Sequence, residues 1–314
     1  MRLATAFDAG LQSPESATAW APPVGYDMSG LKPDILHSNA LALEYWRARG
    51  FACPEHARAC EMGLVCLPRF KVYAKALIAE AAATSRSWVV VDGQKTDGIE
   101  SVWNDLRKRV EIGGTVTKAH GRLFWFRPTP LEEWQLSPSS VDGLRTHPAL
   151  FSADRIDLGS KGLSEALPAT LAGRVADFGA GWGYLTRAVL SHEAVTQVDA
   201  IEIEKHGIDA MRENFDDPRL NAIWGDATVP RRGYDAIVMN PPFHQGRSNA
   251  PSLGQAFIRS AAQSLTRHGK LWMVANRHLP YEATLNESFA EVQSLPPPEG
   301  FKLFEASRPR IVRA

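Results

Sequence analysis

The sequence is poor in cysteine, in long apolar runs and in net charge. Only 3 cysteines occur in 314 residues, and so few thiols without a signal peptide predict reduced cysteines rather than a disulfide framework. No apolar run reaches the roughly 18 residues of a membrane span, so we expect a cytoplasmic protein with no membrane partner. The formal net charge of +0 excludes a dominant nonspecific grip on nucleic acid and shifts any RNA contact onto local patches.

The cysteines do not form a convincing metal-binding pattern either. Cys53, His56, Cys60 and Cys66 are four possible ligands close together in the sequence. They lack the paired Cys-x-x-Cys spacing that makes a zinc site recognisable. We therefore expect no metal.

The sequence does contain a short polar motif after a buried strand. The apolar run 234–239 predicts that strand, and Asn240-Pro241-Pro242-Phe243 ends it abruptly. Both prolines lack a backbone N–H and have a fixed φ, so the carbonyls of Asn240 and Pro241 remain free as acceptors. An amide, two rigid carbonyls and an aromatic ring favour a site for a planar amine, although Asn-Pro also begins ordinary turns.

A second motif precedes it by about sixty residues. Residues 174–178 read as a short buried strand, residues 179–183 as the glycine turn Gly-Ala-Gly-Trp-Gly, and residues 184–190 as a helix. Glycine allows a tight backbone path and the close approach of a ligand. In open α/β sheets, ligands bind beyond the carboxyl ends of the strands, so this corner is a candidate nucleotide site.

The next strand, predicted over 197–203, carries an acid near its end. Glu202 lies 19 residues after Gly183, about where a carboxylate can accept hydrogen bonds from a ribose diol. Asp199 and Glu204 compete for this role. We prefer Glu202, because Asp199 falls within the strand and Glu204 opens the following helix.

These motifs resemble the class I S-adenosylmethionine-dependent methyltransferases rather than a dinucleotide fingerprint. The pattern is Asp-x-Gly-x-Gly-x-Gly, and Trp224-Gly225-Asp226 follows a further strand at 220–224. The resemblance implies that Asp177 faces the methionine part of the donor, Glu202 the ribose and Asp226 the adenine amine. The residues it implies for donor binding are Asp177, Gly179, Ala180, Gly181, Gly183, Glu202, Asp226, Ala227 and Asn240.

Within that class the chain resembles the RsmC/RlmG group of ribosomal RNA guanine-N2 methyltransferases. The resemblance rests on residues 240–246, a helix expected over 253–267, and the segments 151–160, 270–279 and 301–306. It implies a Rossmann-like α/β domain with a seven-stranded, mostly parallel sheet, preceded by a smaller, degenerate α/β methyltransferase-like domain. It also implies S-adenosylmethionine as cofactor and ribosomal RNA or a ribosomal subunit as partner, with no obligate protein partner.

The chemistry of a guanine amine suggests a role for each residue of the motif. We expect Asn240 Oδ1 and the Pro241 carbonyl to accept the two N–H bonds of the amine, and Phe243 to stack on the base. These three are the candidate catalytic residues. Pro242, Phe243 and His244 are candidates for substrate binding. Adenine N6 amines and protein glutamine amides are alternative substrates, and an RNA-binding assembly factor without activity is the non-enzymatic alternative.

Composition and the family resemblance together divide the chain into four expected parts. We expect a flexible segment over 1–32, a degenerate RNA-engaging domain over 33–127, a linker over 128–147 and the catalytic domain over 148–314. The degenerate domain is predicted to contain helices over 38–49, 70–83 and 98–109 and strands over 87–92 and 121–127. No glycine-rich turn follows Val91, so we expect no donor binding in this half. Arg107, Lys108, Arg109, Lys118 and Arg122 form a basic patch that suits RNA contact or a solvated surface equally well.

Overall fold

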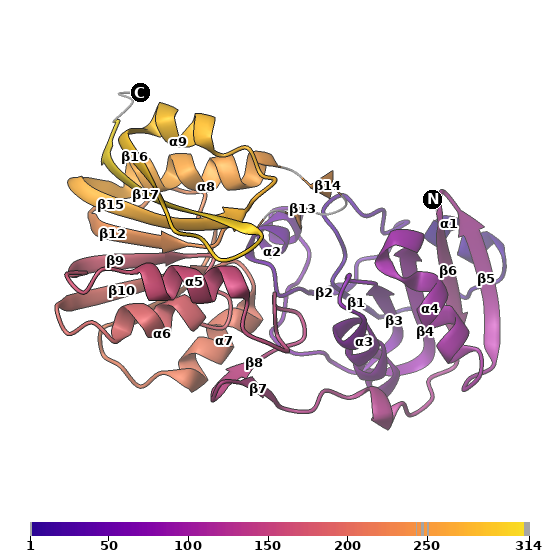
Figure 1. The fold of residues 1–314 in the computed structure, drawn as a ribbon. Coiled ribbons are helices and arrows are strands. Elements are labelled where there is room, and N and C mark those ends of the chain that lie inside the picture. The colour runs from indigo at the N-terminus through magenta and orange to yellow at the C-terminus, as the bar shows by residue number, and fades with distance from the viewer. Residues whose placement is uncertain (1, 243, 246–247, 250, 311–314) are drawn as a thin grey trace. The chain divides into compact units, whose positions relative to one another are not determined.

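The chain forms two compact units, Met1–Ser137 and Pro138–Ala314, each built on its own central sheet (Figure 1). The computed structural model describes residues 2–242, 244–245, 248–249 and 251–310. Across these ranges no helix is long and apolar enough to cross a membrane. In the same residues, no group of three or more His, Cys, Asp or Glu side chains is placed to hold a metal ion.

The second unit has a seven-stranded sheet in the order β11-β10-β9-β12-β15-β17-β16. The first five strands of that order are parallel, and β17 runs antiparallel to both β15 and β16. The strands are β9 (Gly173–Phe178), β10 (Val195–Glu202), β11 (Leu220–Trp224), β12 (Tyr234–Met239), β15 (Leu265–Asn276), β16 (Phe289–Leu295) and β17 (Phe301–Pro309). The predicted seven-stranded, mostly parallel sheet is confirmed.

Helices cover both faces of this sheet. Figure 1 shows α8 and α9 on one face and α5, α6 and α7 on the other. The helices are α5 (Leu158–Ala166), α6 (Tyr184–Leu190), α7 (Lys205–Asn214), α8 (Pro251–Ser264) and α9 (Glu282–Ser288). Strand β12 shows why: Ile237 and Met239 pack in the cluster with α8 and α9, whereas Ala236 and Val238 pack with α5 and α6. A strand buried on both faces reads as a continuous apolar run.

Two short hairpins complete the second unit. Strands β7 (Ser139–Val141) and β8 (Leu144–Thr146) pair antiparallel before the sheet begins. Strands β13 (His244–Gln245) and β14 (Ser248–Asn249) pair antiparallel between β12 and α8.

The first unit has a six-stranded sheet in the order β2-β1-β3-β4-β6-β5. Its strands are β1 (Ala17–Trp20), β2 (Asp34–Leu36), β3 (Cys60–Cys66), β4 (Ser85–Gln94), β5 (Ile112–Lys118) and β6 (Gly121–Phe126). Its helices are α1 (Arg2–Asp8), α2 (Ala40–Arg47), α3 (Lys71–Thr84), α4 (Ile99–Leu106) and the 3₁₀ turns η1 (Lys95–Asp97) and η2 (Glu132–Trp134). Strands β2, β1, β3 and β4 are parallel, and β6 is antiparallel to both β4 and β5.

The two sheets share one topology. Aligned from β5 and β16 inward, the strands of the first unit match those of the second in order and direction, and only the position of β11 has no counterpart among the described strands. The first unit thus repeats the sheet of the second with one edge strand fewer. In this alignment β1 corresponds to β9 and β4 to β15.

The expectation that residues 1–32 lack stable structure is wrong. Strand β1 lies between β2 and β3, and its residue Trp20 is 1% exposed. Helix α1 buries Leu3 and Ala6 in the core of the same unit. The segment is rich in Pro, Ser, Ala and Gly, so local composition suggested disorder. Its order comes from docking on strands that lie distant in the sequence.

The shared topology also corrects the place where a glycine turn would occur. That place follows β1, the counterpart of β9, and not Val91 in β4. After β1 the chain reads Ala21-Pro22-Pro23, and the Pro22 carbonyl accepts a hydrogen bond from Trp46 Nε1 at 3.1 Å. Two prolines offer no N–H donors at this strand end.

The boundary between the units falls between Ser137 and Pro138, inside the segment 128–147 that was expected to be a linker. That segment is not a uniform linker, because η2 belongs to the first unit and the hairpin of β7 and β8 to the second. Trp134 in η2 is 5% exposed. The prolines Pro128, Pro130 and Pro138 of this segment therefore predicted a boundary but not its internal structure.

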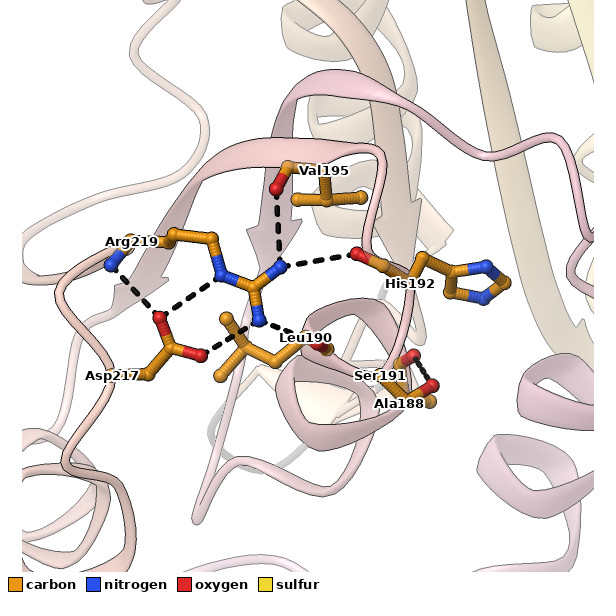
Figure 2. Close-up of polar contacts among 7 residues, drawn as sticks. All are labelled: Ala188, Leu190, Ser191, His192, Val195, Asp217 and Arg219. Carbon is orange, nitrogen blue, oxygen red and sulfur yellow. Dashed lines mark hydrogen bonds and ion pairs between the residues drawn. The ribbon is translucent and has the colours of Figure 1, made fainter.

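A guanidinium clamp holds the connection between α6 and β10. Figure 2 shows Arg219 donating to the carbonyls of Leu190, His192 and Val195, at 2.7, 3.1 and 3.1 Å. Asp217 accepts from Arg219 at 2.7 Å and keeps the guanidinium in place. The last carbonyls of a helix have no partner within the helix, so this arrangement satisfies the carboxyl end of α6.

Candidate functional site

The carboxyl ends of four parallel strands meet at one edge of the second sheet. Phe178 of β9 pairs with Ile201 of β10 on one side and with Met239 of β12 on the other. Glu202, the last residue of β10, pairs with Trp224 of β11. This register brings together Asp177, the glycine turn, Glu202, Asp226 and Asn240, the group that the sequence singled out.

The glycine turn after β9 has a backbone that only glycine adopts readily. Gly179, Gly181 and Gly183 have φ of 74°, 56° and 94°, in the left-handed region where other L-residues are strained. The N–H of Gly179 donates to the Ile201 carbonyl at 2.9 Å. A Cβ on Gly181 would have none of the described atoms within 4 Å. The turn is therefore anchored to β10 and open at Gly181, where a ligand can approach the backbone.

Asp177 is a buried carboxyl group with one unsatisfied oxygen. Its side chain is fully buried, and its Oδ2 accepts from the Thr186 hydroxyl at 2.7 Å. Its Oδ1 has no partner among the described residues. Burial raises the pKa of Asp177 to about 7, and the nearby Glu202 contributes in the same direction. A buried acceptor of this kind favours a bound cationic group.

Glu202 connects the glycine turn to the start of α7. Its Oε2 accepts from the Gly181 N–H at 2.8 Å, and its Oε1 accepts from the Glu204 N–H at 2.9 Å. Burial raises the pKa of Glu202, although these backbone bonds oppose the rise. Each carboxyl oxygen can accept a further hydrogen bond. Glu202 can therefore hold a diol while it holds the turn.

The two competing acids lie in other surroundings. Asp199 accepts from Arg174 at 2.6 Å, from Tyr234 at 2.8 Å and also from Gln197 and Asn221. Burial alone would raise the pKa of Asp199, but these hydrogen bonds hold it below its usual value. Glu204 is the N-cap residue of α7. Asp199 thus has a structural network of its own, within the strand.

Asp226 and Ala227 follow β11, and their side chains lie in different surroundings. Both Asp226 oxygens accept from Thr228, one from its N–H and one from its hydroxyl, at 2.7 Å each. Each oxygen retains one lone pair for a ligand. Ala227 packs in the core cluster beside α8, and its carbonyl accepts from Ser260. The side chain of Ala227 is thus part of the core and not of the strand-end site.

Asn240 lies beside the glycine turn with its amide nitrogen already engaged. Its Nδ2 donates to Asp157 Oδ2 at 3.0 Å and to Ser160 Oγ at 2.9 Å. A Cβ on Gly179 would lie 4.0 Å from Pro242 Cδ, so the two motifs adjoin. Pro241 is buried and Pro242 is exposed. Phe243 lies outside the described residues, and of His244 only the backbone, in β13, is described.

Sequence reasoning missed three residues of this site. Thr186 donates to Asp177, and Asp157 and Ser160 accept from Asn240. The Asp157-x-x-Ser160 spacing was a signal, because an Asp three residues before a helical N–H is typical of an N-cap. That signal predicts a helix start, which α5 confirms, but gives no hint of Asn240.

A family model and several curated proteins are similar in sequence to this chain. A family model described as the methyltransferase small domain matches residues 143–305, more than half of the chain. The ribosomal RNA small subunit methyltransferase C of Salmonella newport is 30% identical over 70% of this chain and 67% of its own. The protein of that name from Hahella chejuensis is 28% identical over 90% of this chain and 89% of its own.

The chain belongs to this methyltransferase family. A solved structure, the Thermus thermophilus 16S ribosomal RNA N2 methyltransferase RsmC in complex with AdoMet and guanosine, superposes with a TM-score of 0.79. The superposition covers 97% of this chain and 91% of that one, at 22% identity. At that identity the match shows that the fold of both units is shared.

The residues present fit the methyl donor of the family. The open backbone at Gly181, the free lone pairs of Glu202 and the unsatisfied Asp177 Oδ1 are an approach surface, a diol acceptor and an acceptor for a cation. All three come from neighbouring strand ends. Which residues contact S-adenosylmethionine stays a prediction.

Replacing Glu202 by alanine should weaken donor binding. The change removes the expected ribose acceptor and frees the Gly181 N–H, together about 1–3 kcal/mol. Isothermal titration calorimetry with S-adenosylmethionine measures the loss. The matched control is Glu204→Ala, two residues further on, for which we expect near wild-type affinity. Equal losses in the two variants would assign the ribose to neither side chain.

Donor affinity should rise with pH through the titration of Asp177. The carboxyl is protonated below its pKa of about 7, and a cationic ligand selects the ionised form, so binding is weakened at low pH. We expect the dissociation constant to fall about tenfold from pH 6 to 8 and then to level off. The same titration of Asp177→Asn is the control, because it contains only the effect of the ligand's own ionisation. Parallel pH profiles for wild type and variant would exclude Asp177 as the titrating group.

Proposed function

We propose that this enzyme transfers a methyl group from S-adenosylmethionine to the exocyclic N2 amine of a guanine in small-subunit ribosomal RNA. The observation that carries the proposal is the position of Asn240 beside the glycine turn with its amide nitrogen engaged by Asp157 and Ser160. Only its oxygen is then left to face a ligand, and a planar amine needs an acceptor. The names and ligands of the relatives support the same substrate.

The reaction requires acceptors and alignment more than a dedicated base. Asn240 Oδ1 and the Pro241 carbonyl accept the two N–H bonds of the amine and hold its nitrogen toward the methyl group. S-adenosylmethionine supplies a methyl already activated by its sulfonium charge, so the carbon–sulfur bond breaks as the nitrogen–carbon bond forms. The surplus proton of the amine then leaves to solvent. Catalysis by positioning of this kind removes a large part of the barrier.

Each donor-side residue has a proposed role that the family resemblance implies and that its contacts allow. Asp177 faces the ammonium of the methionine part, Glu202 the ribose diol and Asp226 the adenine amine. The glycine turn supplies backbone at close approach, with Gly181 as its open point. Phe243 stacks on the guanine, and Pro242 and His244 contact the nucleotide. The residues proposed to hold the donor are Asp177, Gly179, Ala180, Gly181, Gly183, Glu202, Asp226 and the backbone of Ala227, whereas Asn240 meets the donor only through the methyl group being transferred.

The first unit bears on the choice among substrates. Protein glutamine methyltransferases with a related motif resemble proteins whose amino-terminal domain is small and helical. The amino-terminal unit of this chain has a six-stranded sheet instead. The first unit therefore favours RNA over protein as the substrate. It does not separate guanine N2 from adenine N6, which the reaction product must decide.

We assign RNA engagement to the first unit. Of its basic patch, Arg109 is paired with Glu133 at 2.8 Å and Arg122 with Glu100 at 3.1 Å. Arg107 and Lys108 lie exposed at the end of α4, and Lys118 is exposed at the end of β5. Cations already paired gain less from a phosphate than exposed ones. Arg107, Lys108 and Lys118 are therefore the stronger candidates for phosphate contact.

Charge reversal at Arg107 and Lys108 should weaken RNA binding and lower its salt dependence. Each lost phosphate contact reduces the slope of log K against log salt by about 1. Fluorescence anisotropy with labelled ribosomal RNA at several salt concentrations measures the slope. The control is the reversal of Lys32 and Lys95, two exposed lysines of the same unit, which changes net charge equally. If both pairs shift binding alike, only the overall charge matters.

Asn240→Ala should nearly abolish methyl transfer and leave donor affinity unchanged. The amide faces the acceptor amine, so its removal affects the transition state rather than the bound donor. Methylation of small-subunit RNA with labelled donor, followed by nucleoside mass spectrometry, measures activity and identifies the product. We expect N2-methylguanosine from the wild type. N6-methyladenosine, or label found only in protein, would overturn the guanine assignment.

A further inference from the structure

We propose that Asp157 and Ser160 are positioning residues that lock the orientation of the Asn240 amide, so that its oxygen alone is presented to the substrate. The inference deepens the proposed function, because it takes Asn240 Oδ1 as the acceptor of the substrate amine. It addresses a different question, namely what prevents that amide group from flipping by about 180° so that its oxygen and nitrogen exchange places. The two partners lie 83 and 80 residues from Asn240 in the sequence.

The donor count of the amide determines its orientation. A carboxamide has two N–H donors on nitrogen and acceptor lone pairs on oxygen. Here Nδ2 donates once to Asp157 Oδ2 at 3.0 Å and once to Ser160 Oγ at 2.9 Å, so both donors are used. The turned-over amide would place Oδ1 against an oxygen of Asp157, with two acceptors facing each other. Its NH₂ would then face the substrate amine, which is itself a donor.

The lock is built on a rigid element. Asp157 is the N-cap residue of α5, and its Oδ2 also accepts from the Ser160 N–H at 2.8 Å. Leu163 of the same helix is fully buried in the core on that face of the sheet. A Cβ on Gly159 would approach Phe301 within 2.6 Å, so the first turn of α5 packs closely on β17. The acceptors are thus held by the fold and not by the substrate.

An unlocked amide would reduce the rate more than binding. About half of the molecules would present NH₂ to the amine if the two orientations were equal in energy, and those that present oxygen would be less well aligned. The donor contacts neither Asp157 nor Ser160 in this scheme. We therefore expect a fall in kcat, with the Michaelis constant for RNA and the donor dissociation constant nearly unchanged.

The test separates the lock from the N-cap. Asp157→Ser keeps a good N-cap but shortens the side chain below the reach of Asn240, and Ser160→Ala removes the other acceptor. We expect kcat to fall by about two- to tenfold in each, from the molecules that present NH₂ and from the poorer alignment of the others. Asp157→Asn is the rescue variant, because the Ser160 N–H fixes its oxygen in the place of Oδ2. It should retain most of the wild-type rate.

A spectroscopic measurement reports the lock without turnover. In protein labelled with ¹⁵N-asparagine, the side-chain amide of Asn240 is assigned by its disappearance in Asn240→Ala. We expect slow hydrogen exchange of this amide in wild type and Asp157→Asn, and faster exchange in Asp157→Ser and Ser160→Ala. Thermal unfolding and donor titration of the same samples show whether the fold and donor site are intact.

The outcomes distinguish the two proposals. A lower kcat together with faster amide exchange in the unlocked variants supports the positioning role. An unchanged kcat, or a lower kcat with slow exchange retained, overturns it. If the wild type makes a product other than N2-methylguanosine, the proposed substrate is wrong, and the exchange data with that other product still decide whether Asn240 is locked.

Discussion

The parallel pairing of β9 with β10 and β12 is the constraint on which the site depends. It sets Phe178 level with Ile201 and Met239, so the glycine turn, Glu202 and Asn240 leave the sheet at one height. A shift of one residue would turn the side chains of a strand to its other face. Buried apolar residues on both faces of β12 resist such a shift, and the core thereby determines the spacing of polar groups that it does not contact.

The site is arranged around carboxyl groups that the protein itself does not fully satisfy. Asp177 and Glu202 are both buried, and burial raises the pKa of each. A buried acceptor without a partner, here Asp177 Oδ1, destabilises the fold, and a ligand that supplies the missing donor or positive charge offsets this penalty. Asn240 shows the opposite arrangement, with its nitrogen satisfied within the fold. In the proposed roles, the donor site supplies unsatisfied buried acceptors, whereas the substrate site supplies an amide whose orientation is already fixed by the fold.

Motifs that act through local backbone geometry could be predicted from the sequence. The three glycines of the turn, Gly179, Gly181 and Gly183, predict a left-handed backbone. The motif Asn240-Pro241-Pro242 predicts that the strand before it ends there. The contact of Asp157 with Asn240 could not be predicted, because the two residues lie 83 positions apart and no local sequence pattern links them. Strand β1 was not predicted for the same reason, because its four residues acquire their structure by pairing with β2 and β3. The roles of individual site residues remain predictions.

The sheet of the first unit ends at β2, because no described strand takes the place that β11 occupies in the second unit. A strand in that position offers its unpaired N–H and C=O groups to any extended chain, which is how intermolecular β-aggregates begin. Two features counter this tendency. Strand β2 has only three residues, and the Ile35 N–H already donates to the Ala52 carbonyl at 2.8 Å. The edge of the shortened sheet therefore offers few backbone groups for pairing with another chain.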